Sequence, residues 1–144
     1  MLKVVLDTNV LISGSIANLG NPHFIINAWR NQEFILVTSQ EILDEVERVF
    51  QYTHIQKKYH PAAEQIEKFT KLLTTQSIMV DLLSIPDVIP KDPEDNKILA
   101  TALAGKANYL VTGDSHILLI EHYNGVEIVS PTTFVAVLRR GSKS

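Results

Sequence analysis

The feature that most limits the possible folds of this chain is an acidic residue directly after a short apolar run. Residues 4–6 (Val-Val-Leu) are apolar and partly β-branched, which is typical of a strand buried on both faces of a parallel sheet. Asp7 follows at once. Open α/β sheets bind ligands at the carboxyl ends of their strands, so Asp7 is predicted to lie at the mouth of a crevice. The alternative is that Asp7 only begins a turn with Thr8 and Asn9.

A second acid takes the same position near the other end of the chain. Residues 109–112 are predicted to form a strand, and Gly113 and Asp114 end it. Glycine permits a sharp turn, which would expose the Asp114 carboxylate in the same crevice.

A third acid lies at the beginning of a predicted helix. Asp92 is the expected N-cap of this helix, and Pro93 suits its first position. Asp95 precedes apolar residues at i+3, i+4 and i+7, so it lies on the stripe that faces the core. Because a buried carboxylate without a partner is costly, we expect Asp95 to have a functional partner.

Another predicted helix contributes several acids. Thr38 is expected to be its N-cap, with Glu41 three residues later completing a capping box. Glu45 and Glu47 border the apolar stripe of this helix on opposite sides, and Asp44 points further outward. Periodicity therefore leaves Glu45 and Glu47 as alternatives for an inward-facing acid, and a solvated acidic face accounts equally for the cluster.

The remaining segments alternate between strand and helix patterns. Further helices are expected from 21–22, with Asn21 as the N-cap, over 62–74 and from 130–131, and further strands over 34–37, 78–82 and 126–129. This order predicts an α/β fold, a three-layer α/β/α sandwich with a mostly parallel central sheet. With 144 residues, we expect a single domain over 1–140 and a disordered tail over 141–144.

Composition limits the chemistry and the partners of the chain. Cysteine is absent, which excludes disulfides, thiolate catalysis and cysteine-bound zinc. No long apolar run and no signal-peptide pattern is present, so we expect a cytoplasmic protein that does not enter a membrane. The net charge of −3 disfavours an ordinary basic nucleic-acid binder, but burying four acids around cations leaves a net charge of +1. The candidate basic contacts are Arg30, Lys57, Lys58, Lys91, Lys97, Arg139, Arg140 and Lys143.

Clustered carboxylates point to a divalent cation. Carboxylates packed together repel one another unless a cation compensates them, and oxygen ligands favour Mg²⁺ or Mn²⁺. Such ions promote in-line displacement at a phosphodiester. A receiver-like phosphoacceptor domain also gathers acids at strand ends. It needs a lysine at a late strand end, where this chain has Asp114.

Taken in order, these motifs resemble the PIN domain family. The matching stretches are 7–12 (Asp-Thr-Asn-Val-Leu-Ile), Glu45, Asp95 ahead of 98–102 and 110–114 (Leu-Val-Thr-Gly-Asp). The nearer resemblance is to bacterial and archaeal PIN proteins identified as toxins of toxin–antitoxin pairs, akin to VapC. Those proteins share the Asp-Pro-acid-Asp motif at 92–95 and the Thr-Gly-Asp motif at 112–114.

The resemblance implies a metal-dependent endoribonuclease. By matched position, Mg²⁺ or Mn²⁺ would be held by Asp7, Glu45, Asp95 and Asp114, which favours Glu45 over Glu47. Asn9 and Thr112 would orient an acid or a bound water. The implied partners are an RNA substrate, a cognate antitoxin and a second copy of the chain. The alternative is a PIN-like module that binds RNA or protein without cutting.

Two further sets of residues have open roles. His116 is either a metal ligand or substrate contact, or simply a residue of the first turn after Asp114. The tyrosines Tyr52 and Tyr59 flank a pair of lysines at 57–58, and they are either stacking platforms for RNA or ordinary surface residues.

Overall fold

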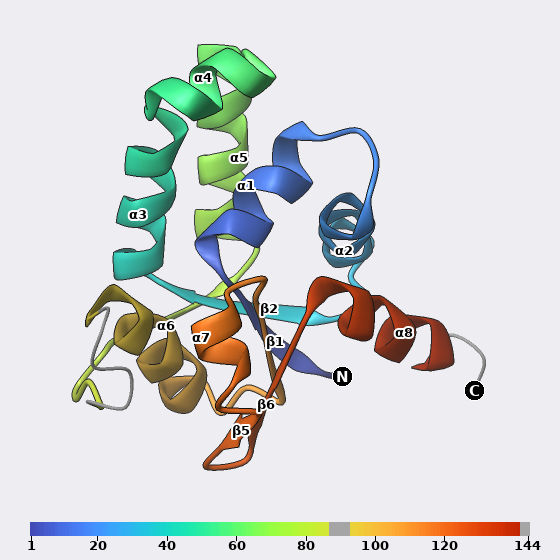
Figure 1. Cartoon of the computed structure of the whole chain (residues 1–144), viewed down its shortest axis with the longest axis vertical. Coiled ribbons are helices and arrows are strands. Elements are labelled where there is room, and N and C mark those ends of the chain that lie inside the picture. The colour runs from blue at the N-terminus through green and yellow to red at the C-terminus, as the bar shows by residue number, and fades with distance from the viewer. Residues whose placement is uncertain (87–92, 142–144) are drawn as a thin grey trace.

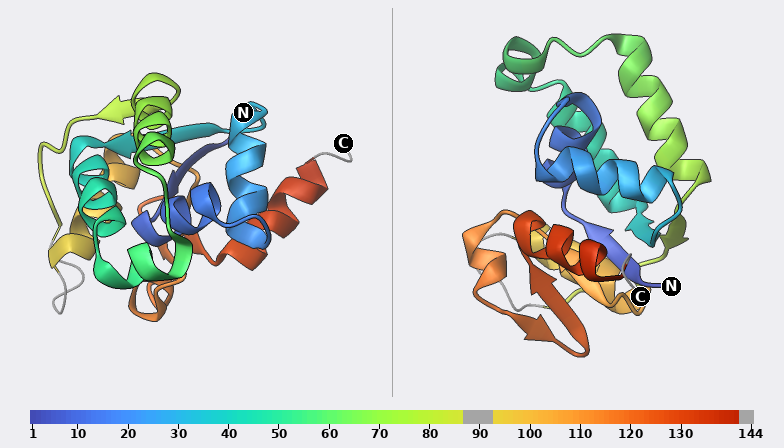
Figure 2. Two further views of the ribbon diagram at one scale, coloured as in Figure 1. Left: turned by 90° about the horizontal axis from the view of Figure 1, so that it is seen from above. Right: turned by 90° about the vertical axis from the view of Figure 1, so that its right-hand side faces the viewer.

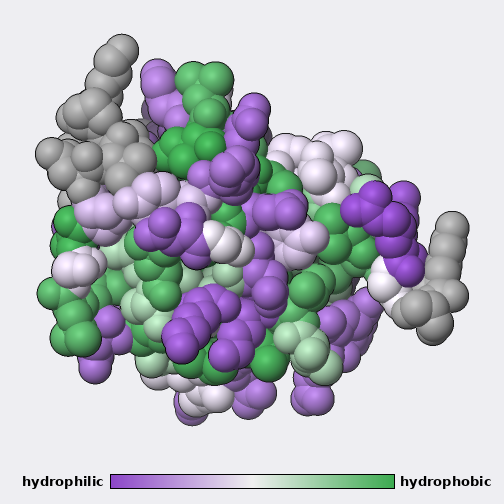
Figure 3. Space-filling model, turned by 90° about the horizontal axis from the view of Figure 1, so that it is seen from below, coloured by the Kyte–Doolittle hydropathy of each residue, from purple (hydrophilic) through white to green (hydrophobic). Residues whose placement is uncertain are grey.

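A computed structural model describes residues 1–86 and 93–141 of the chain (Figure 1). The expected N-cap at Asp92 and residues 142–144 of the expected tail lie outside the described residues. No helix in the described ranges combines the length and apolar character needed to cross a membrane. On the face of the molecule shown in Figure 3, hydrophilic and hydrophobic side chains are interspersed.

The strands form one sheet in the order β3-β2-β1-β4-β6-β5. Their bounds are β1 Lys3–Leu6, β2 Ile35–Ser39, β3 Ile78–Val80, β4 Tyr109–Val111, β5 His122–Tyr123 and β6 Val126–Val129. Neighbouring strands pair in parallel from β3 to β6, and β5 pairs antiparallel with β6. The prediction of a mostly parallel sheet is therefore confirmed.

Helices cover both sides of the sheet. Their bounds are α1 Thr8–Ile16, α2 Asn21–Arg30, α3 Gln40–Phe50, α4 Thr53–Tyr59, α5 Ala63–Thr75, α6 Pro93–Ala104, α7 Ser115–Leu118 and α8 Pro131–Gly141. In the right-hand view of Figure 2, α1, α2, α3 and α5 lie above β1, and α6 lies on the other side of it. Helix α8 packs beside α2, where the side chain of Asn21 donates a hydrogen bond to the Thr132 hydroxyl at 3.0 Å. The predicted three-layer arrangement is confirmed.

The core fixes the central strand rigidly. Val4 and Val5 are fully buried, as expected for a strand covered on both faces. Aromatic rings pack edge to face within the core, with centroids 5.4 Å apart for Phe34 and Phe134 and 6.3 Å apart for Phe50 and Phe69. The residue after β1 is consequently held by an element that cannot shift without disrupting the core.

Helix α1 was not predicted, because its sequence has no amphipathic pattern. Its buried residues are Thr8, Val10, Leu11, Ile12 and Gly14, which are spread around the helix rather than along one stripe. A Cβ added at Gly14 would lie 2.5 Å from the carbonyl oxygen of Pro22 and would also contact Ile26. This glycine therefore allows α1 and α2 to pack closely.

Two expected helix caps differ by one residue from those observed. Ser39, rather than Thr38, is the N-cap of α3, and its hydroxyl accepts a hydrogen bond from the Ile42 backbone N–H at 3.4 Å. Gly20, at φ +102°, caps α2 in place of Asn21. In both cases a neighbouring polar residue misled the sequence interpretation.

Candidate acidic site at the strand ends

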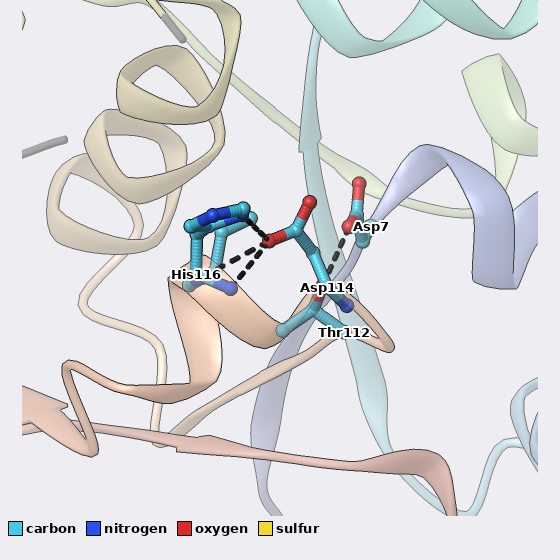
Figure 4. Close-up of polar contacts among 5 residues, drawn as sticks. Asp7, Thr112, Asp114 and His116 are labelled. Atoms are coloured by element: carbon cyan, nitrogen blue, oxygen red, sulfur yellow. Dashed lines mark hydrogen bonds and ion pairs between the residues drawn. The ribbon is translucent and has the colours of Figure 1, made fainter. Parts of the chain in front are cut away.

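The acids at the two strand ends meet where the strand order of the sheet reverses. Strand β1 leads through α1 and α2 to β2 on one side, while β4 lies on its other side. Such a switch point leaves a crevice at the carboxyl ends of the strands. Asp7 follows β1 and Asp114 follows β4 across this point, and Figure 4 shows their carboxylates extending to the same side.

Asp7 is a buried carboxylate fixed by hydrogen bonds to both of its oxygens. Its side chain is 6% exposed and caps the N-terminus of α1, where Oδ1 accepts from the Thr8 backbone N–H at 2.7 Å. Its Oδ2 accepts from the Thr112 hydroxyl at 2.6 Å. The N–H of Asp7 donates to the carbonyl of Val111 at 2.9 Å, which ties the end of β1 to β4. The side chain therefore has a single fixed orientation.

The hydroxyl of Thr112 joins the two acids. It donates its proton to Asp7 and accepts the backbone N–H of Asp114 at 3.0 Å. Thr112 is fully buried, and its own N–H donates to the carbonyl of Val129 on β6. One side chain, itself held by a third strand, thus sets the relative positions of Asp7 and Asp114 (Figure 4).

Asp114 caps a helix, and its side chain is partly exposed to solvent. Its Oδ1 accepts from the backbone N–H groups of His116 at 2.7 Å and Ile117 at 3.2 Å, and so caps α7. The Nδ1 of His116 lies 3.6 Å from the same oxygen, with 62% of the histidine side chain exposed. Gly113 does not have a positive φ, so the connection over residues 112–114 between β4 and α7 does not use the left-handed conformation that glycine permits. The cap on α7 directs Asp114 instead.

The helix acids that were predicted to complete the site lie on α3 and α6. Glu45 is half-buried and Glu47 is exposed, so of these two alternatives Glu45 lies nearer the core; Glu41 of the same helix is half-buried as well. Asp95 is half-buried in the first turn of α6, and the neighbouring Asn96 is 4% exposed. Asn9 lies exposed in the first turn of α1, and its side chain contacts neither of the strand-end acids through a hydrogen bond within the described residues.

A buried hydroxyl pair links the two helices that carry these acids. Ser39 Oγ and Thr101 Oγ1 are 2.9 Å apart, and both residues are fully buried. Thr101 donates its proton to the carbonyl of Lys97, so the proton between the two hydroxyls belongs to Ser39. Sequence reasoning missed this pair, because it joins residues 62 positions apart. It couples the N-terminus of α3 to the middle of α6.

Two other buried hydroxyls lie at the ends of β1 and β2. Thr8 Oγ1 beside Asp7 and Thr38 Oγ1 at the end of β2 are both buried, and neither has a hydrogen-bond partner in the described part of the chain. Buried polar groups of this kind are normally satisfied by ordered water. Both lie at the carboxyl ends of adjacent strands, next to the acids.

The donor set suits a hard divalent cation. In residues 1–86 and 93–141, no group of three or more histidine, aspartate or glutamate side chains is placed to hold a metal ion. Mg²⁺, however, commonly binds through one or two carboxylates and keeps several waters. Asp7 and Asp114, with two unsatisfied hydroxyls nearby, fit that mode of binding. The Nδ1 of His116 lies 3.6 Å from Asp114 Oδ1, so this imidazole stands beside one of the two acids at the N-terminus of α7.

Comparisons with known proteins agree with this arrangement. A model of the PIN domain family matches residues 3–116. An uncharacterised protein from Methanocaldococcus jannaschii is 29% identical over 126 residues, which cover 85% of this chain and 77% of that protein.

Two solved structures share the fold. One is VapBC2 from Rickettsia felis bound to a DNA fragment from its promoter, with a TM-score of 0.58 and 14% identity. The other is FitAcB from Neisseria gonorrhoeae, with a TM-score of 0.53 and 16% identity. Each similarity covers 90% of this chain and 98% of the other.

Proposed function

The chain belongs to the PIN domain family, and we propose that it is a metal-dependent endoribonuclease that hydrolyses RNA phosphodiester bonds. The observation that carries the proposal is the hydroxyl of Thr112, which donates to the Asp7 carboxylate and accepts the backbone N–H of Asp114, the two acids whose carboxylates extend to the same side. Two acids oriented in this way by one buried side chain form a preorganised site for a cation and a phosphate.

We assign the predicted ligands their roles from this geometry. Asp7, buried and fixed at both oxygens, would anchor a Mg²⁺ or Mn²⁺ ion, and Asp114 would share it. Such an ion supplies an activated water and neutralises the charge that develops on the phosphate. Glu45 and Asp95, half-buried on α3 and α6, would complete the group of acids that holds the ion.

Membership of this family also supports the proposal that the chain is the toxin of a toxin–antitoxin pair. VapBC2 and FitAcB are among the solved structures that share this fold, and each similarity covers nine-tenths of the chain. A small antitoxin would then bind near the crevice and block it, and a second copy of the chain could assemble alongside the first. Co-expression with the product of an adjacent short reading frame, followed by purification of the complex, tests this assignment.

Cleavage of RNA by matched variants tests the enzymatic proposal. Asp7→Asn should abolish cleavage that depends on Mn²⁺, because the amide removes a charged oxygen without changing the shape of the side chain. Glu45→Gln should reduce cleavage, whereas Glu47→Gln on the exposed side of the same helix should not. Circular dichroism checks that each variant is folded. Equal cleavage by Asp7→Asn and the unaltered protein would refute the proposal.

One observation favours a second candidate function, a PIN module that binds without cutting. No three acidic or histidine side chains in the described chain are placed to hold an ion together. This alternative predicts that RNA or protein binds with no turnover in Mn²⁺, and that binding is unaffected by Asp7→Asn.

A further inference from the structure

Helix α4 has a composition that the core does not explain. It contributes no buried residue, and only Ile55 packs against the core, where it is half-buried. The side chain of Gln56 donates to the carbonyl of Phe50 at 2.7 Å and so fixes α4 to the end of α3. In Figure 1, α4 lies at the end of α3 that points away from the sheet. The helix is anchored at a few points, and most of its residues face solvent.

The exposed residues of α4 and its flanks combine cations with aromatic rings. Two lysines at 57–58 are exposed, and no acidic residue occurs between Glu47 and Glu64 of this otherwise acidic chain. The Nζ of Lys58 lies 5.1 Å from the ring centroid of Tyr59. We call the residues Tyr52, His54, Lys57, Lys58 and Tyr59 the α4 surface.

The aromatic rings of the α4 surface are accessible at both ends of the helix. Tyr52 is 44% exposed and its ring is 5.9 Å from that of His54, while Tyr59 is half-buried. Seven residues of helix separate the two tyrosines by about 10 Å. Flat rings beside positive charge are the elements with which proteins bind single-stranded nucleic acid, because bases stack on the rings and lysines contact phosphates.

We propose that the α4 surface is a second RNA contact, separate from the acids, that binds a single-stranded segment of the substrate, an inference that rests on the proposed ribonuclease function. Bases within a duplex are already stacked and cannot reach a tyrosine ring, so a surface of this kind selects unpaired strands. A protein partner fits less well, because lysine is depleted in protein interfaces and Ile55, the aliphatic residue of α4, packs inward.

The position of α4 relative to the acids supports this role. Glu45, a half-buried acid of α3, is five residues before the end of that helix, a rise of about 8 Å. An RNA strand that passes Glu45 therefore needs to extend only a short distance along α3 to reach the α4 surface. The helix would contact RNA outside the scissile bond and would leave the hydrolytic step to the acids.

Binding measured without divalent metal separates this inference from catalysis. Fluorescence anisotropy of a labelled single-stranded RNA in EDTA, over a series of salt concentrations, gives both affinity and salt slope. Lys57→Gln/Lys58→Gln should reduce the slope of log K against log salt by about 1.4, because each phosphate contact contributes about 0.7. The matched control Lys71→Gln/Lys106→Gln removes the same charge at exposed sites outside α4 and should leave the slope unchanged.

The tyrosines test stacking independently of charge. Tyr52→Leu and Tyr59→Leu should each weaken binding of single-stranded RNA by about 5- to 100-fold, with no change for duplex RNA. Tyr123→Leu, on β5, is the control and should bind normally. Tyr52 is exposed, so its variant reports on stacking even if Tyr59→Leu is unstable.

The outcomes distinguish this inference from the proposed function. Unchanged RNA binding in both the lysine and the tyrosine variants would overturn the inference and would assign the α4 surface to another partner, even if RNA is still cleaved. If the α4 variants lose RNA affinity and the control variants keep it, the inference is supported, even if cleavage does not depend on Asp7. If the control variants lose as much RNA affinity as the α4 variants, the inference is also overturned, because RNA binding would then not depend on the α4 surface.

Discussion

Replacement of Thr112 by valine removes the link between the two acids while keeping the shape of the side chain. In the structure the Thr112 hydroxyl donates to Asp7 at 2.6 Å and accepts from the N–H of Asp114 at 3.0 Å. Valine retains the branched carbon skeleton, so the packing of this fully buried position changes little. The variant therefore isolates the effect of the hydroxyl.

The expected loss of stability follows from the two hydrogen bonds. A bond to a charged carboxylate contributes about 1.5–3 kcal/mol, and a neutral one about 0.5–1.5 kcal/mol. Valine buries one additional methyl group, which restores about 1 kcal/mol of the stability lost with the two hydrogen bonds. We expect Thr112→Val to lower the free energy of unfolding by about 1–3 kcal/mol, and to lower metal affinity by about 10- to 100-fold because Asp7 loses its orienting partner.

Urea denaturation and metal titration measure the two effects separately. Thr112→Ser is the matched control, since it retains the hydroxyl and loses only a methyl group worth about 1 kcal/mol. The serine variant should keep metal affinity near that of the unaltered protein. If the valine and serine variants have equal metal affinity, the hydroxyl does not organise the site and the reasoning is wrong.

Three further predictions concern packing, helix coupling and ligand linkage. Gly14→Ala should destabilise the protein by about 1–3 kcal/mol in urea denaturation, because its Cβ would lie 2.5 Å from a backbone oxygen, whereas Gly113→Ala, with no atom within 4 Å, should be nearly neutral. A double-mutant cycle of Ser39→Ala and Thr101→Val should give a coupling energy of about 0.5–1.5 kcal/mol, and additive losses would contradict the buried hydroxyl pair. Mn²⁺ at 100 times its dissociation constant should raise the free energy of unfolding by about 2.7 kcal/mol, and this gain should vanish in Asp7→Asn. Equal stabilisation of both proteins by Mn²⁺ would place the ion elsewhere.

The parts of the fold that were predictable are those encoded by local pattern. The run before Asp7 and the run before Gly113 each specify a buried strand from a few adjacent residues, and both strands are present. Helix α3 was predicted for the same reason, since its apolar residues recur at helical spacing and all of them are buried. Such signals survive in a single sequence because they depend only on neighbours in the chain.

The missed parts depend on contacts between distant residues. Helix α1 is buried around much of its circumference, so it carries no stripe for periodicity to detect. Thr38 and Ser39 are both acceptable caps, and the strand length that places Ser39 at the boundary is set by pairing with β3. The bond between Thr112 and Asp7 spans 105 residues, so its geometry is available only from the fold.

The central claim is that Asp7 and Asp114 share a divalent ion, and a crystal soaked in Mn²⁺ tests it most directly. We predict an anomalous difference peak in contact with both carboxylates, at the switch point between β1 and β4. No peak at these side chains, at a Mn²⁺ concentration that supports RNA cleavage, would contradict the account.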